Sequence, residues 1–203
     1  KFTQQTTYDD MCYKNGKCDL PKIKESTKIG TYLQSIHFFR PLGKTLKDFY
    51  TIKTKHKQDA LRLIKNTEAC IHVRIFPESH LKLKKNICPT MKMVIDIVME
   101  FANQSKRIKI FSNDLDFVKK HVHTNSWVSF ADSDNSKTNK YRDFAALTMC
   151  DDLIITCGTF SGQAAALHSG NGNVYYFDDP WFETMYGKEF ISHWRPVSKI
   201  SEY

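Results

Sequence analysis

Apolar and polar residues follow two alternating periods along the chain after residue 53. Short apolar runs, typical of buried strands, lie at residues 69–74, 107–112, 128–130, 153–156 and 174–177. Apolar side chains recur every three or four residues in the stretches that the pattern predicts as helices, at residues 54–65, 90–101, 115–121, 141–149 and 161–168. Strands that alternate with helices in this way favour a parallel, doubly wound α/β sheet.

The same pattern divides the chain into two regions. Residues 66–203 hold the alternation and suffice for one Rossmann-type nucleotide-binding lobe. Residues 1–65 are mostly polar and too short for a complete second lobe. No apolar run approaches the roughly 20 residues that a membrane span needs, so we expect any membrane anchor to lie upstream of this chain.

Polar residues follow three of the predicted strands at their carboxyl ends. These segments are residues 72–80, 112–114 and 157–163. An open parallel sheet binds its ligands beyond the carboxyl ends of its strands, so each segment is a candidate for a ligand site.

The segment "CGTFSGQ", residues 157–163, leads from a predicted strand into a predicted helix. The free N–H groups and positive dipole end of a helix attract phosphate, and Thr159 and Ser161 add hydroxyl donors. Gly162 permits close backbone approach. The alternative is that Ser161 is only an N-cap. Neither a Walker pattern nor GxGxxG is present, so the usual nucleotide signatures do not decide between these interpretations.

Arg74 ends a predicted buried strand, where an unpaired charge is costly. Its partner is either a carboxylate or a diphosphate held by the guanidinium fork. His72 lies two residues earlier and so points to the same face, either as a satisfied core histidine or as a ligand contact. Glu78 is the nearest carboxylate to Arg74 in sequence and is a candidate general base, or a solvated loop residue.

The net charge of +8 narrows the class of partner. It suits nucleic acid, an anionic membrane surface or a phosphorylated small molecule, although scattered lysines also describe an ordinary solvated surface. No basic helix with interleaved aromatic residues and no RRM or OB signature is present, which disfavours nucleic acid.

The six cysteines match no zinc-binding pattern. Cys12 and Cys18 could close a small disulfide loop in an oxidising compartment. Cys70, Cys150 and Cys157 lie in apolar stretches, and we predict them to be buried thiols.

Several segments together resemble the α1,2-fucosyltransferase family, glycosyltransferase family 11. "HVR", residues 72–74, resembles the start of its His-x-Arg-Arg-x-Asp motif, and "GTYLQSIHFF", residues 30–39, resembles its Gly-Tyr-x-Gln-Ser-x-x-Tyr-Phe stretch. "FSNDLDFVKKHV", residues 111–122, is similar to the family's Phe-Ser-Asp-Asp stretch. The longest match is "DFAALTMCDDLIITCGTFSGQAAAL", residues 143–167, and the likeness runs from about residue 30 to the end of the chain.

The resemblance implies a GT-B-like enzyme whose Rossmann-type parallel sheet, in residues 66–203, binds GDP-fucose. Residues 1–65 would then be an incomplete N-terminal lobe on the acceptor side. The implied reaction is an inverting transfer of L-fucose to the 2-hydroxyl of a galactose-terminated glycan, with no metal or other cofactor. The family's catalytic domains lie in the Golgi lumen, tethered to the membrane, so a lumenal location is expected here as well.

The resemblance also implies roles for particular residues. Arg74 matches the arginine that grips the donor diphosphate, and His72 and Asp143 match positions near the guanine. The phosphate-side turn is matched by Thr159, Ser161, Gly162 and Gln163. In this scheme Arg74 and the helix N-terminus stabilise charge on the leaving diphosphate, and Glu78 is the candidate base.

The first motif departs from the family at two places. Ile75 stands where the second arginine is expected, and Pro77 and Glu78 follow Phe76 without the motif aspartate. The protein O-fucosyltransferases resemble this pattern, with an aliphatic residue after His-x-Arg. Two other hypotheses stay open: a non-catalytic GDP-sugar or glycan-binding relative, suggested by these departures, and a basic nucleic-acid-binding protein, suggested by the charge.

Overall fold

The computed structural model describes residues 5–6, 28–29, 51–76, 89–131, 139–177 and 193–198. Near the start of the chain, β1 (Gln5–Thr6) and β2 (Lys28–Ile29) form a two-stranded parallel sheet. Nearly all of residues 1–50 lies outside the described residues, so the division of the chain at residues 65 and 66 stays a prediction. No described helix has the length and apolar character needed to cross a membrane.

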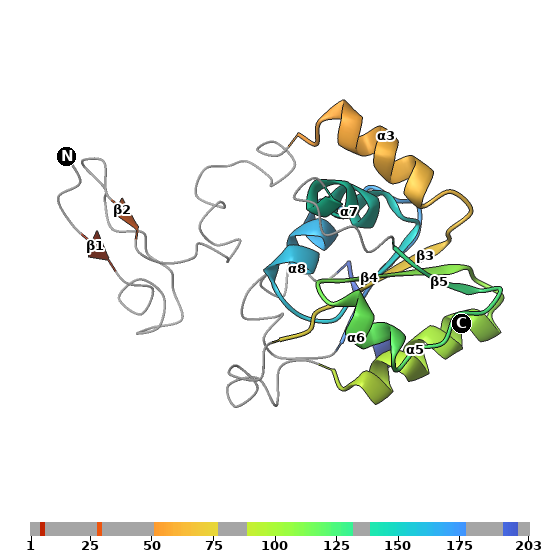
Figure 1. Cartoon of the computed structure of the whole chain (residues 1–203). Coiled ribbons are helices and arrows are strands. Elements are labelled where there is room, and N and C mark those ends of the chain that lie inside the picture. Colours follow the sequence, from red (N-terminus) through yellow and green to blue (C-terminus); the bar gives the residue numbers. More distant parts are fainter. Residues whose placement is uncertain are drawn as a thin grey trace.

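Six parallel strands form the main sheet (Figure 1). They are β3 (Ala69–Val73), β4 (Ile108–Ser112), β5 (Val128–Phe130), β6 (Asp152–Ile155), β7 (Val174–Tyr176) and β8 (Arg195–Pro196). Their order is β5-β4-β3-β6-β7-β8, and every neighbouring pair is parallel. The chain moves outward from β3 to β5 and then returns to the other side of β3. This order confirms the predicted α/β fold class with a Rossmann-type parallel sheet, and the GT-B-like arrangement stays a prediction.

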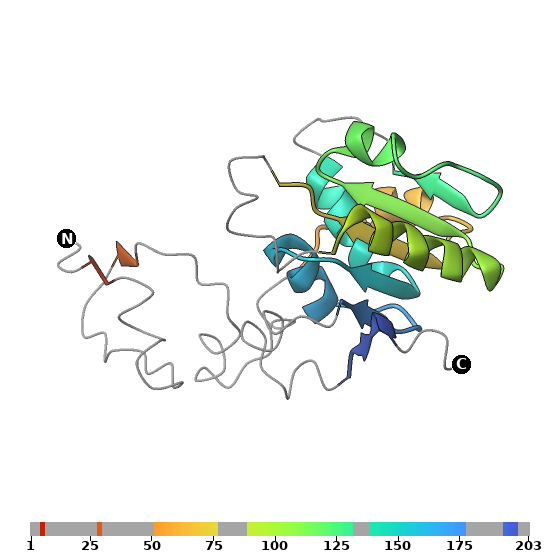
Figure 2. The same ribbon diagram turned by 90° about the horizontal axis from the view of Figure 1, so that it is seen from below.

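Helices cover both faces of this sheet, as the two perpendicular views show (Figures 1 and 2). On one face lie α5 (Met91–Asn103) and α6 (Leu115–Lys119). On the other lie α3 (Thr54–Leu63), α7 (Asn139–Met149) and α8 (Thr159–Ala166). The sheet is therefore buried on both sides, which explains why its strands read as apolar runs.

Strand β3 shows how the two faces are separated. Ala69, Ile71 and Val73 belong to the apolar cluster that includes α5 and α6. Cys70 belongs to the cluster that includes α7 and α8. Because side chains alternate along a strand, His72 shares the side of Cys70 and faces α8.

Two of the predicted helix starts are confirmed by their caps. The Oγ1 of Thr90 accepts a hydrogen bond from the Met93 N–H at 3.3 Å, and the Oδ1 of Asp114 accepts one from the Phe117 N–H at 3.0 Å. A helix was predicted to start at Ser161, but α8 starts at Thr159 and its N-cap is Gly158, so the interpretation of Ser161 as an N-cap is wrong.

The last predicted strand, residues 174–177, is also not the last one observed. Strand β8 follows it and pairs in parallel with β7. It contains only Arg195 and Pro196, and so has no apolar run that could have revealed it.

Cys70 and Cys150 form a disulfide that joins β3 to the end of α7. Cys157 is disulfide-bonded as well. All three are buried as expected, but the prediction that they are thiols is wrong. The fold brings together two residues 80 apart in the sequence, and the apolar setting of each cysteine gives no sign of this. Cys12 and Cys18 lie outside the described residues.

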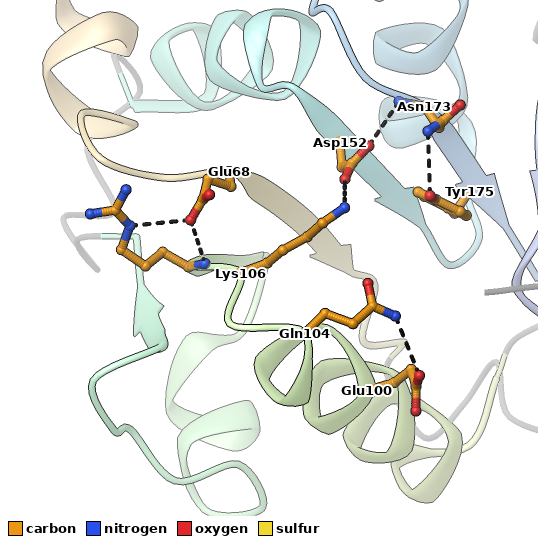
Figure 3. A network of polar contacts seen from close by, with 8 residues as sticks. Glu68, Glu100, Gln104, Lys106, Asp152, Asn173 and Tyr175 are labelled. Carbon is orange, nitrogen blue, oxygen red and sulfur yellow. Dashed lines mark hydrogen bonds and ion pairs between the residues drawn. The ribbon is translucent and has the colours of Figure 1, made fainter. Parts of the chain in front are cut away.

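A polar network occupies the amino ends of the central strands (Figure 3). The buried carboxylate of Asp152 pairs with Lys106 Nζ at 2.5 Å and accepts the Asn173 N–H at 2.8 Å. Glu68 accepts the backbone N–H of Arg107 at 3.0 Å, which lowers the pKa of Glu68, and the Arg107 Nε at 3.2 Å. The four charged side chains of this network are therefore paired with one another.

The ion pair of the buried Asp152 with Lys106 should contribute more to stability than the half-exposed pair of Glu68 with Arg107. Asp152→Asn keeps an acceptor for Asn173 but turns an amide toward the Lys106 ammonium, and should lower the free energy of unfolding by about 1–3 kcal/mol. Glu68→Gln is the matched control, because its partner pair is about half exposed and should change that free energy by less than about 1 kcal/mol. Urea unfolding of both variants checks this, and equal losses would contradict it.

Candidate functional site

The site lies where the strand order reverses. Strands β3 and β6 are paired at this point, and the helices that follow them leave on opposite faces of the sheet. Arg74 follows β3, and the turn at residues 157–163 follows β6. The carboxyl ends of two such strands form the crevice in which doubly wound folds bind ligands. We refer to this place between β3 and β6 as the switch point.

At the switch point Arg74 lies against the turn that begins α8. A Cβ atom placed on Gly158 would be 3.6 Å from Arg74 Cγ and 4.0 Å from its Cδ. Gly158 has φ +90°, a backbone conformation that favours glycine and that turns the chain into the helix. The aliphatic stem of Arg74 therefore runs alongside the N-terminus of α8.

That helix end offers backbone N–H groups to a ligand. The first backbone hydrogen bond of α8 runs from the Gly162 N–H to the Gly158 carbonyl oxygen, at 3.2 Å. The N–H groups of Thr159, Phe160 and Ser161 precede it and have no acceptor within the helix. An arginine and an amide-lined helix end thus meet at one point, which is an arrangement suited to an anion.

The guanidinium of Arg74 has no carboxylate partner among the described residues. Its Cζ lies 5.0 Å from the centroid of the Phe76 ring, and the residue is only partly exposed. Stacking on an aromatic face orients a guanidinium without using its N–H donors. Of the two partners predicted for Arg74, the described residues do not supply the carboxylate.

His72 is buried, with 6% of its surface exposed, and its ring packs on Phe160 at 5.2 Å between centroids. Burial, and then the positive charge of Arg74, lower its pKa to about 3, so the ring is neutral at physiological pH. Within the described residues its Nδ1 is buried and has no hydrogen-bond partner. The interpretation of His72 as a fully satisfied core histidine is therefore wrong at this atom.

The turn residues differ in what they can offer. The hydroxyl of Ser161 is buried and donates within the turn, to the carbonyl oxygens of Cys157 at 3.1 Å and Gly158 at 3.3 Å. The whole residue is 0% exposed, so its hydroxyl is used within the turn and its backbone lies beneath the surface. Gly162 is buried, whereas Thr159 and Gln163 are partly exposed.

Asp143 lies near the start of α7, at the same edge of the sheet. Its Oδ1 accepts hydrogen bonds from Arg142 Nε at 3.1 Å and Nη2 at 2.9 Å. The next residue, Phe144, packs edge-on against Phe160 at 5.4 Å, and Phe160 packs on His72. A row of rings thus links this part of α7 to β3. Glu78, the candidate base, lies outside the described residues.

Two residues near Arg74 were not among the predicted site residues. Thr156 Oγ1 accepts the Arg74 N–H at 3.3 Å and donates to the His72 carbonyl oxygen at 2.9 Å. Asn113 exchanges two hydrogen bonds with the backbone of Ile75. Their signal in the sequence is a polar residue at the end of an apolar run: Thr156 is the last residue of the run 153–156, and Asn113 follows the run 107–112 in the second of the three strand-tip segments.

The metal-independent reaction implied by the resemblance stays a prediction. Within the described ranges, no three His, Cys, Asp or Glu side chains are grouped as they would be to hold a metal ion.

His72 should make the protein less stable as the pH falls from 6.5 toward 3. In this range the imidazole is protonated in the unfolded chain and neutral in the folded one, so the unfolded state binds more protons. The resulting loss is about 2 kcal/mol between pH 7 and pH 5. Urea unfolding at both pH values should show it in the parent chain and a smaller loss in His72→Gln. An equal pH dependence of the two proteins would contradict the burial of a neutral His72.

Comparison with known proteins gives a family and a set of relatives. The sequence profile described as "Glycosyl transferase family 11" matches residues 26–196. Galactoside alpha-(1,2)-fucosyltransferase 1 from Homo sapiens, Gorilla gorilla gorilla and Pan troglodytes is 33% identical over 88 residues. This stretch is 43% of the chain and 22% of each relative, so the match spans about a fifth of the length of these curated relatives.

One solved structure is also similar in part. The crystal structure of POFUT1 in complex with GDP gives a TM-score of 0.47 at 13% sequence identity, over 62% of this chain and 47% of that chain. The family match extends over most of the sequence, includes the strands on both sides of the switch point, and confirms the predicted resemblance. The chain belongs to glycosyltransferase family 11.

Proposed function

We propose that the chain binds GDP-fucose at the switch point and transfers L-fucose to the 2-hydroxyl of a galactose-terminated glycan. Membership of family 11 supports glycosyl transfer, and the name of the galactoside alpha-(1,2)-fucosyltransferase 1 relatives supports the sugar, the linkage and the acceptor class. One structural observation supports the donor most directly: Arg74, with no carboxylate partner in the described part of the chain, lies against the N-terminus of α8.

The diphosphate of the donor suits this arrangement. A guanidinium fork can take two phosphate oxygens, and the free N–H groups of the partly exposed Thr159 and Phe160 can take others. Both positive features approach from neighbouring strand ends, so a single diphosphate can meet them together. The stem of Arg74, held beside Gly158, keeps the guanidinium near the helix end.

The guanine end of the donor is assigned to His72 and Asp143. A buried, neutral imidazole with an unpartnered Nδ1 can accept or donate one hydrogen bond, according to its tautomer. A carboxylate such as Asp143 suits the N1–H and N2–H donors of guanine. The row of rings formed by Phe144, Phe160 and His72 would line the path between these two groups.

The proposed reaction is a single displacement with inversion. The 2-hydroxyl oxygen of the acceptor forms a bond to the anomeric carbon while the bond from that carbon to the diphosphate oxygen breaks. The hydroxyl proton passes to a base, for which Glu78 is the candidate, and GDP leaves with an added negative charge. Arg74 and the α8 N–H groups stabilise that charge as it develops, a contribution on the order of 10²–10³-fold for one such donor.

A lumenal location in the Golgi is part of the proposal. Among the described residues, Cys70, Cys150 and Cys157 are all disulfide-bonded and buried. Disulfides persist in oxidising compartments and are rare in the cytosol. Attachment to a membrane through an anchor outside this chain remains a prediction.

A non-catalytic GDP-sugar-binding relative is the second candidate, and one observation favours it. Ile75 occupies the place of the second motif arginine and packs against the apolar cluster on the α5 face. The position therefore contributes to the core and offers no second cation. Incubation of the chain with GDP-fucose and a panel of galactosides separates the candidates: product supports the enzyme, and GDP binding without product supports the relative.

Arg74→Ala should weaken GDP binding and fucose transfer by at least about 10²-fold while the urea midpoint stays close to that of the parent. Arg74→Lys should recover only part of the loss, because an ammonium keeps the charge but not the two-pronged geometry. Arg62→Ala is the matched control, since it removes the same charge from an exposed position on α3. Calorimetric titration with GDP and a transfer assay measure these effects.

Near-parent GDP affinity in Arg74→Ala would refute the donor site proposed here. If the parent chain binds oligonucleotides in a salt-dependent manner that GDP does not alter, the basic surface is a nucleic-acid site instead.

A further inference from the structure

The backbone ladder of β3 ends just before Arg74. Its pairing with β4 ends at Val73 opposite Ser112, and its pairing with β6 ends at His72 opposite Ile155. Residues 74 and 75 thus lie beyond the last rungs on both sides. The next residue on each neighbouring strand is polar, Asn113 after β4 and Thr156 after β6.

Asn113 continues the pairing on the β4 side with its side chain. Its Oδ1 accepts the Ile75 N–H at 2.9 Å, and its Nδ2 donates to the Ile75 carbonyl oxygen at 2.9 Å. The amide therefore acts as a substitute for a backbone peptide group. Such a pair of bonds needs a donor and an acceptor on one planar group, which aspartate does not provide when ionised.

On the β6 side, the side chain of Thr156 bonds to the β3 backbone beyond the last paired residues. Its hydroxyl accepts from the Arg74 N–H at 3.3 Å and donates to the His72 carbonyl oxygen at 2.9 Å, and the side chain is buried. The backbone around Arg74 is thereby bonded to side chains from both neighbouring strands.

The turn that presents Asn113 is itself fixed. The Asp114 N–H donates to Ser112 Oγ at 3.0 Å, and the Asp114 carboxylate caps α6. Asn113 is therefore anchored between the end of β4 and the start of a helix. Because Asn113 is held in this way, its two hydrogen bonds also hold the backbone of Ile75 in place.

We propose that Asn113 and Thr156 form a two-sided clamp that positions Arg74 for an anionic ligand. The clamp fixes the backbone on each side of the arginine, while Gly158 and Phe76 fix its stem and guanidinium. The segment then loses its conformational entropy when the protein folds. Binding of a ligand costs less entropy as a result, which favours affinity. The value of the clamp for the ligand rests on the proposed function, in which Arg74 holds the donor diphosphate.

The first experiment needs no ligand. In the parent chain, the Ile75 amide should be protected from hydrogen exchange, and Arg74 Nε should show restricted motion by ¹⁵N relaxation. Asn113→Ala and Asn113→Asp should lose the protection and increase the motion. Thr156→Val should increase the motion at Arg74, and Thr156→Ser, which keeps the hydroxyl, should restore the parent values. Unchanged motion of Arg74 in all the variants would overturn the clamp.

The second experiment measures GDP affinity by calorimetry. Both Asn113 variants should bind GDP about three- to tenfold more weakly, the range that the loss of one or two partly exposed hydrogen bonds allows. Asn113→Ala adds no charge, so weakening by Asn113→Asp alone would indicate repulsion of the phosphates and would overturn the clamp. Asn103→Asp, at an exposed position at the far end of α5, adds the same charge and should leave the affinity unchanged.

A background of Arg74→Lys shows whether Asn113 acts through the arginine. In this background Asn113→Ala should weaken GDP binding by less than about twofold, because the fork that it positions is absent. An undiminished effect would show that Asn113 contacts the ligand directly, and would overturn the positioning role.

The two proposals can fail separately. If the parent does not bind GDP but the Asn113 variants still loosen Arg74, the donor site fails and the clamp stands. If the parent binds GDP and every clamp variant binds it equally well, the clamp fails and the donor site stands.

Discussion

The pairing of β3 with β6 is the contact on which the rest of the site depends. These strands are not consecutive in the sequence, and between them the chain builds the whole outer half of the sheet, with β4 and β5. Because the strands that follow β6 extend the sheet in the opposite direction, the described helices that follow β3 and β6 lie on opposite faces of the sheet. Arg74 and the turn at residues 157–163 meet at these two strand ends, although more than 80 residues separate them in the sequence.

The polar groups at the two edges of the sheet differ in whether they have partners. At the amino edge, Asp152 is paired with Lys106, and Glu68 with Arg107. At the carboxyl edge, the buried Nδ1 of His72 and the guanidinium of Arg74 have no hydrogen-bonding or carboxylate partner among the described residues. A polar group that is buried without a partner is costly, and among the described residues this cost falls at the carboxyl edge, on His72 Nδ1.

Local patterns in the sequence predict most of this fold but only part of the site. Each of the five short apolar runs forms a strand, and Thr90 and Asp114 cap helices as their side chains suggest, because these features depend on nearby residues alone. The Cys70–Cys150 disulfide and the hydrogen bonds of Asn113 depend on which strands become neighbours, and this is a property of the whole sheet. The predicted start of α8 is wrong for a different reason. The helix begins after Gly158, whose positive φ turns the chain, whereas the sequence shows Ser161 as the more familiar capping residue.

The alternation of side chains along the strand explains why a single arginine remains at this point. Arg74 is two residues after His72, so its side chain points to the same face of the sheet and lies on the side of α8. Ile75 points to the opposite face and packs with the core beneath α5. A second cation at residue 75 would therefore have to leave the apolar face or bend the segment, and the bonds of Asn113 to the Ile75 backbone oppose such bending. In the proposed donor site, the positive charge that the described residues contribute comes from Arg74 and from the dipole of α8. Both are held by backbone geometry, so the site depends less on the number of its cations than on how firmly the ends of β3 and β6 are fixed to each other.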